Sequence, residues 1–220
     1  MAFDAFDGFP NLLTLFFTRA REKGEAPFLW AKIDGVWRST SWAEAARQVA
    51  ALARALRADG LEPGDRVLLV SENRPEWCIA DLAIMAAGCV TVPTYTTNTE
   101  RDHQHILTNS GARAVIVSTA KLARTLLPAI VRSEGVELVL SMEEVRGGQP
   151  GQLHFRRWDE MTAGGTDADV AAIAAEVAPV NRDALACIIY TSGTGGAPRG
   201  VMQHHGAILH NVTGAAQVIA

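Results

Sequence analysis

Small residues, hydroxyl groups and a single cation gather between Tyr190 and Gly200, and these residue types together can bind phosphate. Glycines let the backbone adopt φ > 0 and approach a ligand closely. Hydroxyls can donate to phosphate oxygens, and a guanidinium offers a fork of charged donors. The residues that we predict to bind phosphate are Thr191, Ser192, Gly193, Thr194, Gly195, Gly196 and Arg199.

Other interpretations of this segment are weaker. A flexible surface turn has a similar composition, because Gly, Ser, Thr and Pro are also common loop residues. A Walker A loop needs Lys and then Ser or Thr after its last glycine, where this chain has Val201 and Met202. A dinucleotide-binding GxGxxG pattern fails because the glycines are misplaced. The clustered hydroxyls and the cation favour phosphate binding.

The neighbouring elements must position this segment. A short apolar strand is predicted over Leu185–Tyr190, and a helical pattern begins near His205. Strand, loop of small residues and helix in direct succession would present backbone N–H groups to an anion. We therefore expect the loop to open onto the start of a helix.

Upstream, apolar strands alternate with helices of ten or more residues, which is typical of an α/β fold with a parallel-rich sheet flanked by helices. The predicted strands are Arg66–Ser71, Cys89–Val92, Ala112–Ser118 and Val136–Leu140. The predicted helices are Pro75–Ala87, Glu100–Asn109 and Lys121–Ser133, the last broken or bent at Pro128.

The first part of the chain shows a different pattern. A helix is predicted over Leu12–Lys23, followed by a hairpin whose strands meet at Asp34-Gly35. Ser41 and Glu44 fit a capping box for a helix that continues over Ala45–Ala58. Further along, Arg146–Gly151 is predicted to be an exposed loop and Ala163–Pro179 a surface helix with flexible flanks.

Composition is that of a soluble globular protein. Hydrophobic residues make up 48% of the chain and charged residues 20%. The formal net charge is -4, so we do not expect the chain to bind nucleic acid. Cys78, Cys89 and Cys187 are widely spaced and are interpreted as small core residues in a reducing cytoplasm. The histidines lack metal-ligand spacing, and no metal-ligating residue is predicted.

The segment from Tyr190 to Gly200 resembles the phosphate-loop signature of the adenylate-forming (AMP-binding) superfamily, which contains acyl-CoA synthetases, luciferases and adenylation domains. That pattern reads Tyr/Phe-Thr-Ser-Gly-Ser/Thr-Thr-Gly-x-Pro-Lys-Gly, and Val201, His205 and Asn211 continue it in step. Two positions depart: Gly195 replaces a threonine, and Arg199 replaces the lysine while keeping its charge.

The resemblance extends upstream. Four further stretches are similar to the N-terminal half of these enzymes, and the last of them is closest to long-chain fatty acyl-CoA synthetases. These stretches are Ser41–Gly60, Gly64–Val67, Glu72–Trp77 and Pro93–Thr99. The resemblance implies that 1–220 is an incomplete N-terminal AMP-binding domain and that the C-terminal domain is absent.

Two-step chemistry is also implied. A carboxylate attacks the α-phosphate of ATP to give an acyl-adenylate and pyrophosphate, and the thiolate of CoA then displaces AMP. ATP, Mg²⁺, fatty acid and CoA are the implied ligands, and Thr191, Ser192, Thr194 and Arg199 would hold the β- and γ-phosphates. Catalytic residues are unknown and expected beyond residue 220, so we expect the chain alone to be inactive.

Several alternatives stay open. The chain could belong to an amino- or aryl-acid-activating enzyme, or to a non-catalytic nucleotide-binding or interaction module. Phe3, Phe6 and Phe9 could touch a membrane, although a packed terminus is the simpler interpretation. A sheet cut short would expose an unpaired edge, so self-association is expected.

Overall fold

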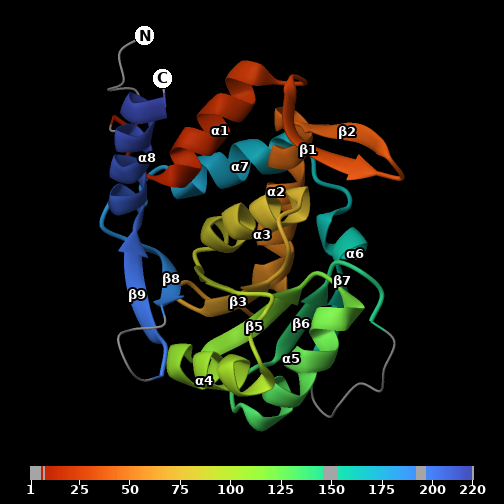
Figure 1. Cartoon of the computed structure of the whole chain (residues 1–220). Helices are drawn as coiled ribbons and strands as arrows, with labels where there is room; N and C mark the ends of the chain where they lie inside the picture. Colours follow the sequence, from red (N-terminus) through yellow and green to blue (C-terminus); the bar gives the residue numbers. More distant parts are fainter. Residues whose placement is uncertain (1–5, 7, 146–152, 192–196, 220) are drawn as a thin grey trace.

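The computed structural model describes residues 6, 8–145, 153–191 and 197–219. The predicted loop over Arg146–Gly151 lies outside these residues. Among the described residues, helices and strands alternate through most of the chain, as the α/β prediction requires (Figure 1).

A seven-stranded sheet forms the centre of the molecule, in the order β7-β6-β5-β3-β4-β8-β9. Its neighbours pair in parallel except for β8 and β9, which are antiparallel. The strands are β3 (Arg66–Val70), β4 (Val90–Thr94), β5 (Ala112–Val117), β6 (Leu138–Ser141), β7 (His154–Arg157), β8 (Leu185–Thr191) and β9 (Arg199–His204).

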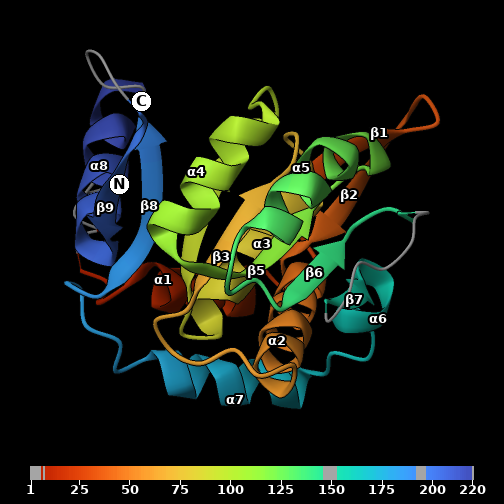
Figure 2. The same cartoon turned by 90° about the horizontal axis from the view of Figure 1, so that it is seen from below.

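Helices cover both faces of this sheet (Figure 2). On one face lie α1 (Leu12–Lys23), α2 (Trp42–Ala58), α3 (Pro75–Ala86) and α7 (Asp167–Val177); on the other lie α4 (Glu100–Ser110) and α5 (Ala120–Arg132). The remaining helices are α6 (Trp158–Thr162) and α8 (His205–Ile219), the latter following β9 at one side of the sheet.

Alternation along the strands divides the interior into two cores. On β3, Val67 and Leu69 pack with α1–α3, whereas Leu68 and Val70 pack with α4 and α5. Successive strand residues point to opposite faces, so a strand covered on both sides reads as a continuous apolar run. This is why β3 and β5 are recognisable in the sequence as buried strands.

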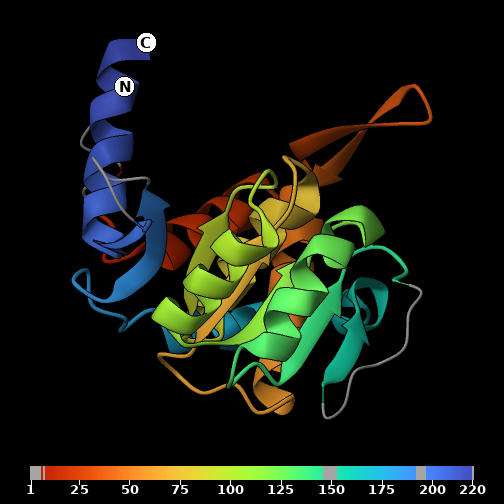
Figure 3. The same ribbon diagram turned by 60° about the horizontal axis from the view of Figure 1, so that its bottom comes forward.

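A separate two-stranded hairpin projects from the body of the molecule (Figure 3). It consists of β1 (Pro27–Ile33) and β2 (Val36–Ser41), joined at Asp34-Gly35 as predicted. Both turn residues have positive φ, 49° and 81°, which is the requirement of a type I′ turn and explains the Asp-Gly pair.

Side-chain caps fix the starts of most helices. The Ser41 hydroxyl accepts from the backbone N–H of Glu44, as the sequence predicts for α2. Thr99 and Thr166 form complete capping boxes with Asp102 and Asp169. Each satisfies donors that the first helical turn would otherwise leave unpaired.

Three expectations need correction. The helix α5 continues through Pro128 without a break, because Leu122, Leu126, Ala129 and Ile130 form one buried face that keeps it packed. The strand β7 and the helix α6 were not predicted. Most importantly, β9 lies between the predicted phosphate segment and α8, so strand, loop and helix do not follow in direct succession.

Candidate functional site

The predicted phosphate-binding residues lie at the carboxyl end of β8 and the start of β9. Thr191 ends β8, Arg199 begins β9, and the two are directly opposite one another in the antiparallel ladder. The structure therefore brings together the first and the last of the predicted residues. Ser192, Gly193, Thr194, Gly195 and Gly196 lie outside the described residues.

Thr191 and Arg199 share one face of the β8–β9 ribbon. Opposed residues in an antiparallel pair project to the same side, so both side chains leave the backbone on one face of the ribbon. Both residues are exposed. Because β9 and not a helix start follows the segment, the positive group at this end of the segment is the Arg199 side chain and not a helix terminus.

The opposite face of the ribbon is packed. Tyr190 is 6% exposed and belongs to the core shared with α4 and α5. It pairs with Gly200, where an added Cβ would lie 2.7 Å from Ile188 Cγ2 and 3.1 Å from Tyr190 Cζ. Gly200 is therefore needed for close packing and not for an unusual φ, which corrects our expectation of backbone freedom at this glycine.

Two side chains of α4 contact the ends of the segment. Tyr190 Oη donates to Asn109 Oδ1 at 2.6 Å. His105 Nε2 lies 2.9 Å from the carbonyl oxygen of Pro198. Burial raises the pKa of Tyr190, so its hydroxyl stays protonated as a donor. No motif in the sequence identifies His105 or Asn109, because their partners are some eighty to ninety positions away.

The start of α8 adds a buried histidine. His205, in step with the family signature, is 3% exposed, and burial, helped by the nearby His204, lowers its pKa to about 4. His204 Nδ1 accepts from the backbone N–H of Ala207 at 3.1 Å and caps the helix. His205 is therefore neutral near pH 7 and supplies no charge to a phosphate.

Polar groups also gather at the carboxyl ends of β3, β5 and β6. Ser118 donates to Glu72, and Arg74 bonds both Glu76 and Glu143, at 2.8 Å and 3.4 Å. These groups satisfy one another. The cluster therefore offers no open site.

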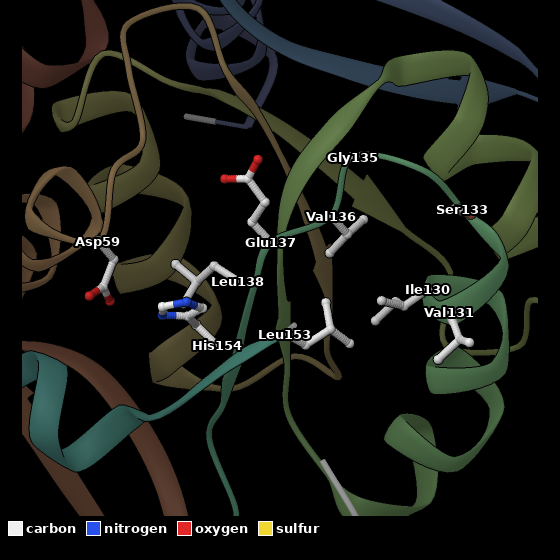
Figure 4. A pocket seen from close by; sticks show the side chains of 10 residues that line it. All are labelled: Asp59, Ile130, Val131, Ser133, Gly135, Val136, Glu137, Leu138, Leu153 and His154. Carbon is white, nitrogen blue, oxygen red and sulfur yellow. The ribbon is translucent and has the colours of Figure 1, made fainter. Parts of the chain in front are cut away.

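A wide surface hollow lies at the other end of the sheet, not beside the phosphate segment. It has a volume of about 910 Å³ and lies at the starts of β6 and β7, where Glu137, His154 and Asp59 face it together with apolar side chains (Figure 4). Three strands separate β6 from β8, and β7 lies one strand further away. We assign it no role in phosphate binding.

The three cysteines lie in or against the core. Cys89 and Cys187 are buried, Cys78 is partly buried, and all three are free thiols. Burial raises the pKa of both Cys89 and Cys187 to about 11, so neither is a thiolate at neutral pH. Within the described ranges, no three His, Cys, Asp or Glu side chains are grouped to hold a metal ion.

The N-terminal aromatic residues pack against the chain. Phe6 lines a small apolar pocket with Leu12 and Phe16, and the guanidinium of Arg19 lies 5.9 Å from the centre of the Phe9 ring. Phe3 lies outside the described residues. None of the helices in the described part of the chain has the length and apolar character needed to cross a bilayer.

Comparison with known proteins agrees with this geometry. Residues 16–219 match the family described as AMP-binding enzyme. The long-chain-fatty-acid–CoA ligase FadD15 of Mycobacterium tuberculosis is 34% identical over 93% of this chain and 33% of its own length. The human mitochondrial acyl-coenzyme A synthetase ACSM5 is 32% identical over 83% of this chain and 30% of its own.

Solved structures show the same fold. The anthranilate CoA ligase AuaEII, in complex with anthranoyl-AMP, superimposes with a TM-score of 0.75 at 20% identity, over 93% of this chain and 36% of that one. A benzoate CoA ligase from Burkholderia xenovorans superimposes with a TM-score of 0.68 at 26% identity, over 89% of this chain and 35% of that one. This chain spans about a third of the length of the curated relatives it matches. It belongs to the AMP-binding enzyme family of adenylate-forming ligases.

Proposed function

We propose that the β8–β9 segment binds the β- and γ-phosphates of ATP in an AMP-forming acyl-CoA synthetase. The observation that carries this proposal is the pairing of Thr191 with Arg199 on one exposed face at the two ends of the segment. A hydroxyl donor and a permanent cation in this position can stabilise the negative charge of the phosphates.

The segment's part in the reaction is binding and orientation. The acid's carboxylate attacks the α-phosphate, and the bond to pyrophosphate breaks. Arg199 would hold the departing charge, and Thr191, with Ser192 and Thr194, would donate to phosphate oxygens. Mg²⁺, when bound with ATP, neutralises phosphate charge; the described residues show no ligand set for it, and we assign it no step.

Nucleotide titration tests the assignment. We expect the chain to bind ATP and Arg199→Ala to weaken binding roughly 10- to 100-fold, because a charge-assisted hydrogen bond is lost. Arg199→Lys keeps the positive charge and restores the lysine of the family pattern, so this variant should bind within a few fold of the unsubstituted chain.

Arg38→Ala is the matched control, because Arg38 is an exposed arginine on the distant β1–β2 hairpin. Isothermal titration calorimetry measures the affinity for ATP of the unsubstituted chain and of the three variants. If the unsubstituted chain does not bind ATP, or Arg199→Ala binds equally well, the assignment is wrong.

We further propose a long-chain fatty acid as the acid substrate. The support is the similarity to the FadD15 ligase over 93% of the chain. Aryl acids are the second candidate, because a feruloyl-CoA synthase from Amycolatopsis is 32% identical over 78% of the chain. In a polypeptide that carries this sequence together with the rest of a ligase, pyrophosphate release with palmitate and with ferulate separates the two.

The 220 residues alone are proposed to be inactive, since they span about a third of the relatives' length. A coupled pyrophosphate-release assay with ATP, CoA and a panel of fatty acids should show no acid-dependent turnover. A cytoplasmic location is also proposed, on the support of three free cysteines.

A further inference from the structure

Both ends of the phosphate segment are held by one helix. Tyr190, immediately before Thr191, donates its hydroxyl to Asn109, and Pro198, immediately before Arg199, presents its carbonyl oxygen to His105. His105 and Asn109 are four residues apart on α4, so they lie on the same face of the helix. Figure 1 shows α4 beside the start of β9.

The contacts around Tyr190 leave little freedom. The rings of His105 and Tyr190 meet edge to face, with centroids 6.3 Å apart and an interplanar angle of 88°. Gly200, directly across the ladder, leaves no space for a side chain between the Tyr190 ring and Ile188. The separation of α4 from β8 and β9 is therefore fixed by the Tyr190 ring, Gly200 and His105.

The direction of the second hydrogen bond is determined by its acceptor. A carbonyl oxygen can only accept, so the proton of this bond sits on His105 Nε2. Another side chain with a donor at the same distance can replace His105. An apolar side chain of similar size leaves the Pro198 carbonyl without this hydrogen-bond donor.

We propose that His105 and Asn109 are positioning residues, which hold Thr191 and Arg199 at the separation that phosphate binding needs. This rests on the proposed function of the segment. Neither residue touches phosphate; each acts through the neighbour of a phosphate-binding residue. Groups that bind a ligand through directed hydrogen bonds lose affinity when they move by fractions of an ångström, so a helix can set the affinity of a segment that it supports.

The first experiment compares three side chains at position 105. His105→Leu should weaken ATP binding about five- to tenfold, the effect of one lost hydrogen bond, and His105→Gln should remain within about twofold of the unsubstituted chain because its amide can donate to the Pro198 carbonyl. Thr108→Leu, an exposed substitution on the same helix, is the control and should not change affinity. Equal affinity in the Leu and Gln variants would overturn the proposal.

Tyr190→Phe extends the test to the other end of the segment. It removes one hydroxyl and keeps the ring in the core, so the variant should fold and bind ATP about three- to tenfold more weakly. Melting temperatures separate positioning from general destabilisation: affinity should fall in His105→Leu and Tyr190→Phe while the melting temperature stays near that of Thr108→Leu. A loss of affinity that only follows melting temperature across all variants would contradict positioning.

A measurement without nucleotide keeps this inference distinct from the proposed function. Amide hydrogen exchange should be faster at Thr191, Arg199 and Gly200 in His105→Leu than in the unsubstituted chain, and restored in His105→Gln. If the unsubstituted chain fails to bind ATP, the proposed function is wrong, and exchange still decides whether α4 holds the strands. If exchange at these amides is the same in the Leu variant, positioning by His105 is wrong.

Discussion

Burial shifts the pKa values of two ionisable side chains, Asp81 and His205, in opposite directions, each of them against the charged form. Asp81 on α3 lines an apolar pocket of about 350 Å³, where burial raises its pKa to about 6 although a hydrogen bond from Thr91 acts in the other direction. His205 at the start of α8 has its pKa lowered to about 4 by burial and by His204. Both therefore titrate in the folded protein between about pH 4 and 6.

Their effects on stability have opposite signs. Between about pH 4 and 6, folded Asp81 keeps a proton that the unfolded chain releases, so its contribution to the free energy of unfolding falls as the pH rises. In the same range, folded His205 stays neutral while the unfolded chain binds a proton. Its contribution to the free energy of unfolding therefore falls as the pH drops from about 6.5 to 4. In the intact protein the two slopes oppose each other.

Asp81→Asn should separate the contributions of Asp81 and His205 to the pH dependence of stability. Relative to the intact protein, the variant's free energy of unfolding should rise with pH between about 4 and 6, by up to about 1.4 kcal/mol per unit, and be constant above. His205→Gln should show the reverse trend. Urea unfolding across this pH range measures both, and other titrating groups cancel in the difference. Variant curves parallel to that of the intact protein would contradict the assigned burial effects.

At the scale of elements, Arg57 joins three helices. From α2, its Nη2 and Nε donate to the carbonyl oxygens of Ala86 and Ala87 at the end of α3, at 2.6 Å and 3.1 Å, and its Nη1 pairs with Glu176 on α7. The last carbonyls of a helix lack partners within the helix, and a cation there also complements the helix dipole. Arg57 is thus a cap supplied by a neighbouring helix.

We expect Arg57→Ala to lower the free energy of unfolding by roughly 1.5–3 kcal/mol, because the carbonyl oxygens lose charge-assisted hydrogen bonds. Arg54→Ala on the same helix is the matched comparison: the Arg54 side chain is 59% exposed and pairs only with Asp169 among the contacts described, so its loss should cost less than about 1 kcal/mol. Urea denaturation of both variants measures the difference. Equal losses would show that Arg57 acts as an ordinary surface charge.

Elements with local signals could be predicted from the sequence. The Asp34-Gly35 turn, the Ser41 cap and the helix α1 depend on a few neighbouring residues, and the structure confirms them. The strand β9 could not be predicted, because Arg199–His204 has no apolar alternation and becomes a strand by pairing with β8. For the same reason the types of Thr191 and Arg199 suggest phosphate binding in the sequence, whereas their direct opposition and the contacts of α4 with Tyr190 and Pro198 could not be predicted.

At the scale of the whole molecule, the sheet has two unlike edges within the described part of the chain. The edge strand β7 has four residues and includes Arg156 and Arg157, and charged residues on a short edge discourage pairing with another chain. The edge strand β9 has six residues and carries Val201 and Met202, which are 42% and 70% exposed. The order of strands that creates these edges is a long-range property that periodicity does not specify.

We therefore propose that the chain associates with itself through β9. An edge strand presents unpaired N–H and C=O groups, and exposed apolar side chains on it add burial to any pairing that forms. Size-exclusion chromatography with light scattering should show a mass that increases with protein concentration. Met202→Lys places a charge on this edge and should shift the protein towards the monomer, whereas Val131→Lys, at another exposed apolar position, on α5, should not. A monodisperse monomer for the unsubstituted chain, or an equal response to both substitutions, would show that β9 does not pair between copies.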